Sequence, residues 1–142
     1  MAEFRCDGLD GLMLSMQEIA EIPDEIIDAI LNAQADALIP EIQERGRGYG
    51  VEAEGSGKML KSIKKGKIRI KKKSRSITVS PTGSRARGKK RTKNTEIAFL
   101  NNYGTRHQKA RPFWTDAEKT SALTVTAAGE QIVDKWLTSK NL

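Results

Sequence analysis

The chain has 142 residues, of which 37% are hydrophobic and 30% are charged, a composition that suits one domain with a single modest core. With one cysteine and one histidine it cannot close an internal disulfide or supply four zinc ligands by itself. No run of about 18 apolar residues occurs, and acids stand where a secretory signal would carry bases, so we expect a cytosolic product without a membrane span.

The net charge of +7 is distributed very unevenly along the chain. Residues 1–54 hold 13 acids and 3 bases, residues 55–95 hold 16 bases and no acid, and residues 96–142 hold 5 acids and 6 bases. Clustered Lys and Arg favour contact with phosphate groups, whereas complementary acidic and basic segments favour assembly of copies with one another. A solvated basic surface without a partner is the third interpretation, and composition alone leaves all three open.

The N-terminal region predicts a short strand over residues 3–6, followed by a short amphipathic helix over residues 9–22. Pro23 ends this helix. The apolar residues at helical spacing that support it are Leu9, Leu12, Met13, Met16, Ile19 and Ala20.

A long helix is predicted next, over residues 24–45, because two acids open it and an apolar stripe runs along it. We expect it to end at Gly46. Pro40 lies inside this span and removes one backbone donor, so a kink or an early end near Leu38 is also expected.

Residues 47–57 are glycine-rich and predict an irregular connection. The pair Gly57-Lys58 does not belong to a nucleotide-binding loop, because Glu52 and Met59 occupy positions where that motif requires Gly and Ser or Thr. Ser56 instead suits the cap of a single helical turn, which would carry Met59, Leu60 and Ile63.

Residues 58–93 predict a basic hairpin followed by a basic loop. Ile68 and Ile70, then Ile77 and Val79, alternate with polar residues, as in two antiparallel strands that turn near Lys73. One face of this hairpin would pack on the helices and the other would be strongly basic. Residues 81–93 have no aliphatic side chain larger than Ala, so we expect an exposed, disordered loop there.

The C-terminal region, residues 94–142, predicts a short helix that Thr95 would cap and a left-handed Gly104 would end. A long last helix then begins at Pro112. Its apolar stripe comprises Trp114, Ala117, Ser121, Val125, Ala128, Ile132 and Trp136.

These elements make one domain, residues 1–142, of the α+β class: a small antiparallel sheet packed against two long helices, with an extended basic hairpin and loop. Its segments are the N-terminal helices (1–46), the glycine-rich connection (47–57), the basic hairpin and loop (58–93) and the C-terminal helices (94–142).

Three motifs in this order resemble the tail-component family of siphophages and their prophages, also described as head-to-tail joining or tail-completion proteins. The stretch Ser56-Gly57-Lys58-Met59-Leu60-Lys61-Ser62-Ile63 is similar to Thr-Gly-x-Leu-x-x-Ser-Ile in that family. Asn102-Tyr103-Gly104-Thr105 resembles its Glu, aromatic, Gly, Thr sequence, and Ala110-Arg111-Pro112-Phe113 resembles the opening of its last helix. The chain departs from the family at Ser56, at Asn102 and by one added residue at Met59-Leu60.

The resemblance implies a structural virion protein of the head-to-tail neck, made in the host cytoplasm, without enzymatic activity or a cofactor. Its implied partners are further copies in a ring, a hexamer or dodecamer, and the portal or head-closure protein and the tail terminator, with genomic DNA in the channel. The residues that carry the family motifs are Gly57, Leu60, Ile63, Tyr103, Gly104, Thr105, Arg111, Pro112 and Phe113.

The candidate contact residues, for assembly or for DNA, are all basic and lie on the predicted hairpin and loop. We expect the loop to become ordered on assembly. The candidates are Lys71, Lys72, Lys73, Arg75, Arg85, Arg87, Lys89, Lys90, Arg91 and Lys93.

Two other functional classes stay open. A small basic nucleic-acid-binding protein would also carry such a hairpin, although residues 58–93 contain no aromatic residue for base stacking. An enzyme such as a nuclease is disfavoured, because His107 has no evident catalytic partner in the sequence. Trp114 and Trp136 are interpreted as core residues rather than interface anchors, and Arg111 is expected to point outward.

Overall fold

The computed structural model describes residues 2–6, 12–17, 22–51, 58–72, 74–87 and 89–140. The elements in chain order are β1 (Ala2–Cys6), β2 (Leu12–Gln17), α1 (Asp24–Gly48), α2 (Lys58–Lys61), β3 (Ile63–Lys65), β4 (Arg69–Lys71), β5 (Ser74–Pro81), β6 (Ser84–Arg87), β7 (Lys90–Lys93), α3 (Asn94–Tyr103), α4 (Phe113–Thr120) and α5 (Ala122–Ser139).

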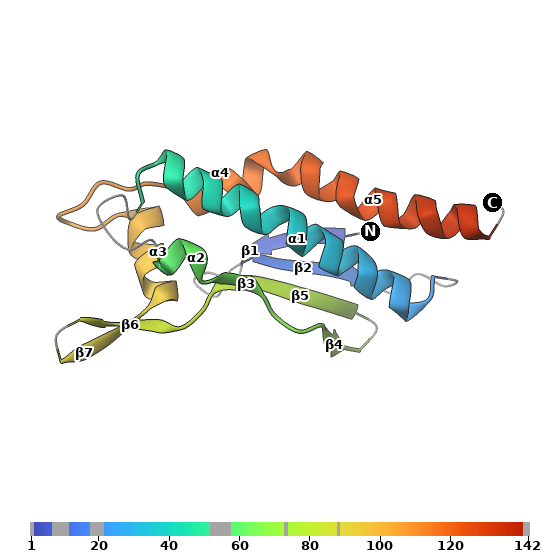
Figure 1. Ribbon diagram of the computed structural model, residues 1–142, viewed down its shortest axis with the longest axis horizontal. Coiled ribbons are helices and arrows are strands. Elements are labelled where there is room, and N and C mark those ends of the chain that lie inside the picture. The colour runs from blue at the N-terminus through green and yellow to red at the C-terminus, as the bar shows by residue number, and fades with distance from the viewer. Residues whose placement is uncertain are drawn as a thin grey trace.

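Within the described residues, five strands form one antiparallel sheet in the order β1-β2-β5-β3, with β4 also paired to β5. Strands β6 and β7 form a separate two-stranded hairpin. The long helices α1 and α5 run side by side on one side of the main sheet (Figure 1). The expected α+β arrangement, with two long helices on a small sheet and an extended basic hairpin, is confirmed.

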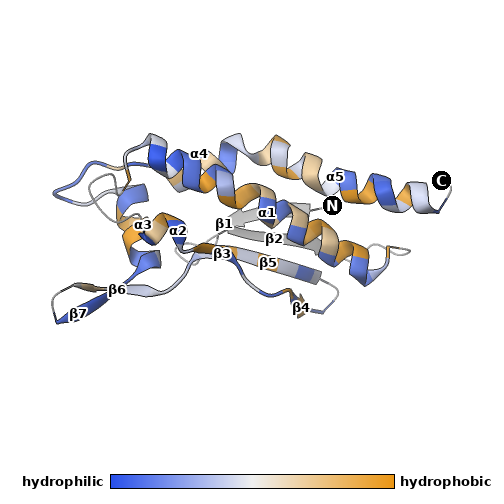
Figure 2. Cartoon of the chain, in the orientation of Figure 1, coloured by the Kyte–Doolittle hydropathy of each residue, from blue (hydrophilic) through white to orange (hydrophobic). Residues whose placement is uncertain are grey.

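The core lies between α1, the inner side of β5 and the last two helices. Ile27, Leu31, Leu38 and Ile42 of α1 are fully buried, and Phe113 at the start of α4 is fully buried with them. This apolar stripe is visible on α1 in Figure 2, where it alternates with hydrophilic residues. Burying these side chains is the dominant favourable term for the fold.

The predicted helix over residues 9–22 is wrong, because Leu12–Gln17 is strand β2. Leu12, Leu14 and Met16 recur with a period of two, which also fits a strand. The backbone of this strand pairs with β1 on one side and with β5 on the other. The expected strand over residues 3–6 is confirmed by β1. Leu9, Ile19 and Ala20 lie outside the described residues.

Helix α1 does not end early but continues through Pro40 to Gly48. Leu38 and Ile42 are fully buried on either side of the proline, and their burial offsets the backbone bond that Pro40 cannot make. Gly46, expected to end the helix, is instead a buried helical residue that lies against the side chains of Leu60 and Phe113.

The expected disordered loop over residues 81–93 is instead the β6–β7 hairpin. Its base is held by Asn94, whose backbone N–H donates to the Gly83 carbonyl at 3.0 Å and whose side-chain amide donates to the Thr82 carbonyl at 2.7 Å. Gly83 has a φ of +75°, which glycine adopts without strain. Backbone hydrogen bonds and a fixed turn therefore order a segment that lacks apolar side chains.

The last helix is divided at Ser121 into α4 and α5 rather than being continuous. Ser121 is fully buried, and its hydroxyl donates to the Ala117 carbonyl, a competing bond that weakens helices. The predicted stripe is confirmed in part: Trp114, Ala117 and Val125 are buried, and Ile132 packs against the core while partly exposed. Trp136, expected in the core, is only half-buried and lies outside the core cluster.

The short helix α3 begins at Asn94, two residues earlier than a cap at Thr95 predicts, so Thr95 is not its cap. Gly104 ends it with a φ of +78°, as the sequence predicts.

Candidate assembly and nucleic-acid interface

The candidate basic residues form two groups that lie far apart. One group is on the β4–β5 turn, where Lys71 and Lys72 are exposed and Lys72 has a φ of +55°; Lys73 lies outside the described residues. The other is on the β6–β7 hairpin. Figure 1 places these hairpins at opposite ends of the molecule, so they do not form one continuous patch.

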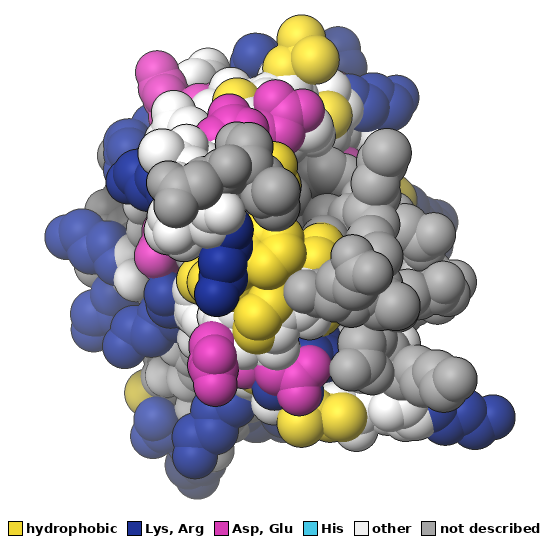
Figure 3. Space-filling model, turned by 90° about the vertical axis from the view of Figure 1, so that its right-hand side faces the viewer, with side chains coloured by type: hydrophobic (Ala, Val, Ile, Leu, Met, Phe, Trp, Pro, Cys, Tyr) yellow, Lys and Arg dark blue, Asp and Glu magenta, His cyan; other side chains and the backbone are white. Residues whose placement is uncertain are grey.

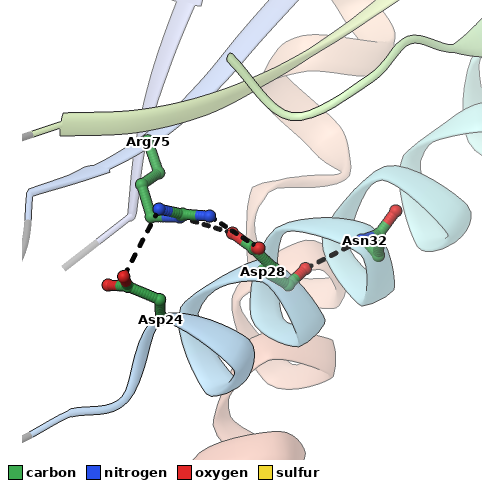
Figure 4. A network of polar contacts seen from close by, with 4 residues as sticks. All are labelled: Asp24, Asp28, Asn32 and Arg75. Carbon is green, nitrogen blue, oxygen red and sulfur yellow. Dashed lines mark hydrogen bonds and ion pairs between the residues drawn. The ribbon is translucent and has the colours of Figure 1, made fainter. Parts of the chain in front are cut away.

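Arg75 faces α1 rather than solvent. Its guanidinium donates to both carboxylate oxygens of Asp28, at 2.6 and 2.8 Å, and lies 3.6 Å from the carboxylate of Asp24 (Figure 4). The Arg75 side chain is only 15% exposed. A bidentate guanidinium–carboxylate pair fixes the relative orientation of its two side chains, so Arg75 holds β5 against α1. We call this pair the clamp.

The β6–β7 hairpin presents its bases to solvent. Lys89, Lys90, Arg91 and Lys93 are exposed, and Arg91 donates to the Ser84 hydroxyl at 3.1 Å. The register pairs Arg85 with Thr92 and Arg87 with Lys90. The side chains of Arg85 and Arg87 lie outside the described part of the structure.

Acidic residues of α1 are divided between internal pairs and open surface. Asp24 and Asp28 bind Arg75, and Asp36 pairs with Lys65 of β3 at 2.9 Å. The acids of α1 that make no ion pair within the described part of the chain are Glu25, Glu41 and Glu44. About half of the acids on this helix are therefore available to a partner.

Glu41 and Glu44 line a surface depression of about 440 Å³ near the end of α1, together with Arg45, Gly48 and Tyr49. The Tyr49 hydroxyl donates to the Asp116 carboxylate on α4. This hydrogen bond raises the pKa of Tyr49, with desolvation and the Asp116 charge adding to it. The lining of the depression thus carries two carboxylates, the Arg45 guanidinium and a phenol, and its net negative charge favours a cationic side chain.

At the opposite end, where α1 begins, the surface is mixed. Figure 3 shows hydrophobic side chains in the middle of this end with carboxylates above and below, and Lys and Arg side chains gathered to the left and along the lower side. Charges of both signs therefore lie close together around a hydrophobic centre at this end of the molecule.

The second family-like motif forms a cap that joins α3 to α4. Asn102 is 95% buried, and its side-chain oxygen accepts from the backbone N–H groups of Trp114 and Thr115 at 3.1 and 3.2 Å. It therefore caps the start of α4 from a distant position in the chain, the role that Asn usually plays from the preceding residue. Tyr103 beside it is 54% exposed, and its ring lies 4.8 Å from that of Phe99.

The third motif is tied to the end of α1. Arg111, expected to point outward, instead donates from its guanidinium to the Gly50 carbonyl at 3.0 Å and is half-buried. A Cβ at Gly104 would lie 2.7 Å from the Ala110 backbone nitrogen, so the loop closes on itself only with glycine there. Phe113 enters the core as expected, after the half-buried Pro112.

The first motif is described only in part. Leu60 and Ile63 are buried, which agrees with a structural role. Gly57 and Ser56 lie outside the described residues. Exposed Thr105 accepts a hydrogen bond from the His107 backbone N–H through its side-chain oxygen, at 3.2 Å.

No catalytic or metal-binding arrangement is evident among the residues that the structure describes. His107 is exposed on the loop between α3 and α4, and no group of three His, Cys, Asp or Glu side chains comes together in the described ranges. Among these same ranges, none of the helices has the length and apolar character needed to span a membrane.

Two residues with specific contacts escape prediction from the sequence. Asp28 binds a guanidinium 47 residues away, and Asn102 caps a helix that begins 11 residues later. Neither position carries a local signal, because both partners are supplied by tertiary packing. No protein-family model, curated protein or solved structure matches this chain.

Proposed function

We propose that this chain is a structural, non-enzymatic component of the virion neck of a tailed bacteriophage. Copies form a ring between the portal or head-closure protein and the tail terminator. The three motifs that resemble the tail-component family support this proposal. Two of them have specific structural roles: Asn102 caps α4, and Arg111 binds the end of α1.

The observation that carries the proposal is the placement of unpaired charges of opposite sign on separate surfaces. Glu41 and Glu44 lie on α1, whereas Lys89 and Lys90 lie on a hairpin that projects beyond the end of the main sheet (Figure 1). Within the described part of one copy, no ion pair joins these groups. A second copy can bring them together, and a contact between two different patches generates a closed ring when its rotation closes.

In the proposed contact, the β6–β7 hairpin of one copy docks on the depression at the end of α1 of the next. Exposed ion pairs contribute only about 0–1 kcal/mol each, so charge selects the partner and orientation more than it supplies affinity. Tyr49, 38% exposed at the depression, offers the apolar surface that such a contact also needs.

Charge reversal tests this contact directly. The double variants Glu41→Lys/Glu44→Lys and Lys89→Glu/Lys90→Glu are each expected to prevent ring formation, and the mixture of the two is expected to restore it. Sedimentation velocity and negative-stain microscopy measure the outcome. Glu130→Lys/Asp134→Lys, which reverses two exposed acids on α5, is the matched control and should assemble normally. Equal behaviour of all three variants contradicts the contact.

The place in the virion is tested genetically. Loss of the gene is expected to leave DNA-filled heads and finished tails that do not join, and unchanged particles would contradict the neck assignment. Deletion of residues 84–93 should prevent assembly without unfolding the core. Normal rings and unchanged phage yield after that deletion would rule out a role for the hairpin.

The second candidate function is a small basic nucleic-acid-binding protein, favoured by the absence of any acid between residues 55 and 95. A titration of the isolated subunit with DNA separates the two functions. Tight binding at physiological salt by a subunit that never forms a ring supports the second candidate.

A further inference from the structure

On β3, β4 and β5, the side of the main sheet turned away from α1 and α5 is a polar, basic surface. We call it the outer sheet face and define it by a row of hydroxyls on β5 with bases on the neighbouring strands β3 and β4. Its members are Ser74, Ser76, Thr78, Ser80, Lys64, Arg69 and Lys71.

Strand register establishes which side chains share this face. Residues directly opposite each other in an antiparallel pair point to the same side. Lys64 lies opposite Ser80, whereas the next residue, Lys65, lies opposite buried Val79 and reaches Asp36 on α1. Successive residues of a strand therefore alternate between the helix side and the outer side.

The same alternation holds on β4. Arg69 lies opposite Ser76 and Lys71 opposite Ser74, whereas the intervening residue pairs with Arg75, which faces α1. The three bases thus line one long edge of the hydroxyl row. Lys64, Arg69 and Lys71 are exposed and form no ion pair within the described part of the chain.

The hydroxyl row is long enough to follow a polyanion. Alternate residues of a strand are about 6.8 Å apart, so the row from Ser74 to Ser80 spans about 20 Å. That length corresponds to roughly six base pairs of duplex DNA. Each hydroxyl is half-exposed, and none donates a side-chain hydrogen bond within the described residues.

We propose that the outer sheet face binds the phosphate backbone of double-stranded DNA without reading its sequence. Hydroxyls donate to phosphate oxygens, and the three bases neutralise phosphates and release their counterions. This inference rests on the proposed function in one respect: duplex DNA is the polyanion that a neck ring encloses.

The composition of the face favours duplex DNA over two other occupants. Single-stranded nucleic acid is bound largely by stacking on aromatic rings, and residues 58–93 contain none. A second copy of the chain would need apolar anchors, but the members of the face on β3, β4 and β5 are all hydroxyls or bases.

The test measures the salt dependence of binding to a labelled 20-base-pair duplex by fluorescence anisotropy, from low to physiological salt. The variant Lys64→Ala/Arg69→Ala/Lys71→Ala should bind more weakly. The slope of log K against log salt should fall by about 2.7, because each lost phosphate contact removes about 0.9. Ser76→Ala/Thr78→Val should weaken binding and leave the slope unchanged.

The matched control, Arg106→Ala/Lys109→Ala/Lys119→Ala, removes three exposed bases from elsewhere and should keep the wild-type slope. The proposal is overturned if both triple variants lose the same amount of affinity for the duplex. It is also overturned if the wild type does not bind the duplex at low salt. Preference for a single strand over the duplex also overturns it.

Sedimentation velocity on the same variants separates this proposal from the ring itself. A triple variant on the outer face that loses DNA binding and still forms rings supports the proposal. If that variant instead binds DNA normally and fails to form rings, the face is a contact between copies. The proposal then fails while the neck function stands.

Discussion

The two hairpins of this molecule, β4–β5 and β6–β7, are both antiparallel and strongly basic, yet they are held in different ways. In the first, Ile77 and Val79 enter the core and Arg75 binds Asp28 on α1. The described side chains of the second contribute nothing to the core, and this hairpin is fixed at its base by Asn94. A basic hairpin can therefore be anchored by buried surface or by a few backbone hydrogen bonds, and the two anchors have different energies.

The largest expected effect comes from removing the apolar anchor of the first hairpin. Ile77→Ala should lower the free energy of unfolding by about 2–5 kcal/mol, because a fully buried side chain is lost and a cavity remains. Thr92→Ala on β7 is the matched change in the second hairpin and should cost about 0.5 kcal/mol or less. Urea unfolding measures both. Similar losses would show that the hairpins are not anchored differently.

The next effect comes from the clamp between the first hairpin and α1. Asp28→Ala should cost about 1–3 kcal/mol, since the guanidinium of Arg75 is mostly buried and loses its charged acceptor. Asp36→Ala, which breaks the exposed pair with Lys65, is the control and should cost at most about 1 kcal/mol. If both variants lose similar amounts of stability in thermal unfolding, the Arg75–Asp28 pair contributes no more than an exposed ion pair.

A smaller and more local effect is expected at the base of the second hairpin. Asn94→Ala removes the bond to the Thr82 carbonyl and should cost about 1 kcal/mol. Amide hydrogen exchange should accelerate within residues 84–93 and stay unchanged in β5. Asn101→Ala, which removes a similar bond within α3, is the control. Uniform acceleration across the main sheet would contradict separate anchoring.

The smallest expected effect on stability concerns Glu118, which lies outside both hairpins. Burial raises the pKa of Glu118 above its ordinary value of 4.5, with Lys119 opposing the shift. The folded chain thus holds this proton more tightly than the unfolded chain, so ionisation costs stability as the pH rises through the folded pKa. Glu118→Gln should raise the melting temperature slightly at about pH 7 and not at about pH 3. An equal change at both pH values would contradict this cause.

The contrast between the hairpins also explains which parts of the fold can be predicted from the sequence. The alternation of Ile77 and Val79 with polar residues predicts β5 correctly, because one face of that strand enters the core. Residues 84–93 offer no such alternation, so their strands depend on a turn and on Asn94, which reasoning from apolar residues cannot detect. Strand β2 is predicted wrongly for the opposite reason: its apolar residues fit both the helical spacing and the alternation of a strand.

In the candidate site, too, features set by composition can be predicted from the sequence, whereas features set by distant contacts cannot. The basic charge of residues 55–95 is evident from composition, and the exposed positions of Lys71 and Lys89 agree with it. The commitment of Arg75 to Asp28 depends on a contact across 47 residues, which charge patterning does not reveal. The outer sheet face likewise requires the register of three strands, so it emerges only in three dimensions.

Helix α3 is fastened at both of its ends by asparagine side chains. Asn94 bonds the strand that leads into the β6–β7 hairpin, and Asn102 bonds the first turn of α4. Through Arg111, the same junction also reaches the carbonyl of Gly50 beyond α1. The ten residues of α3 therefore connect the base of the hairpin to α4 and to the segment after α1, so we expect a force applied to the hairpin to reach the helical layer through these hydrogen bonds.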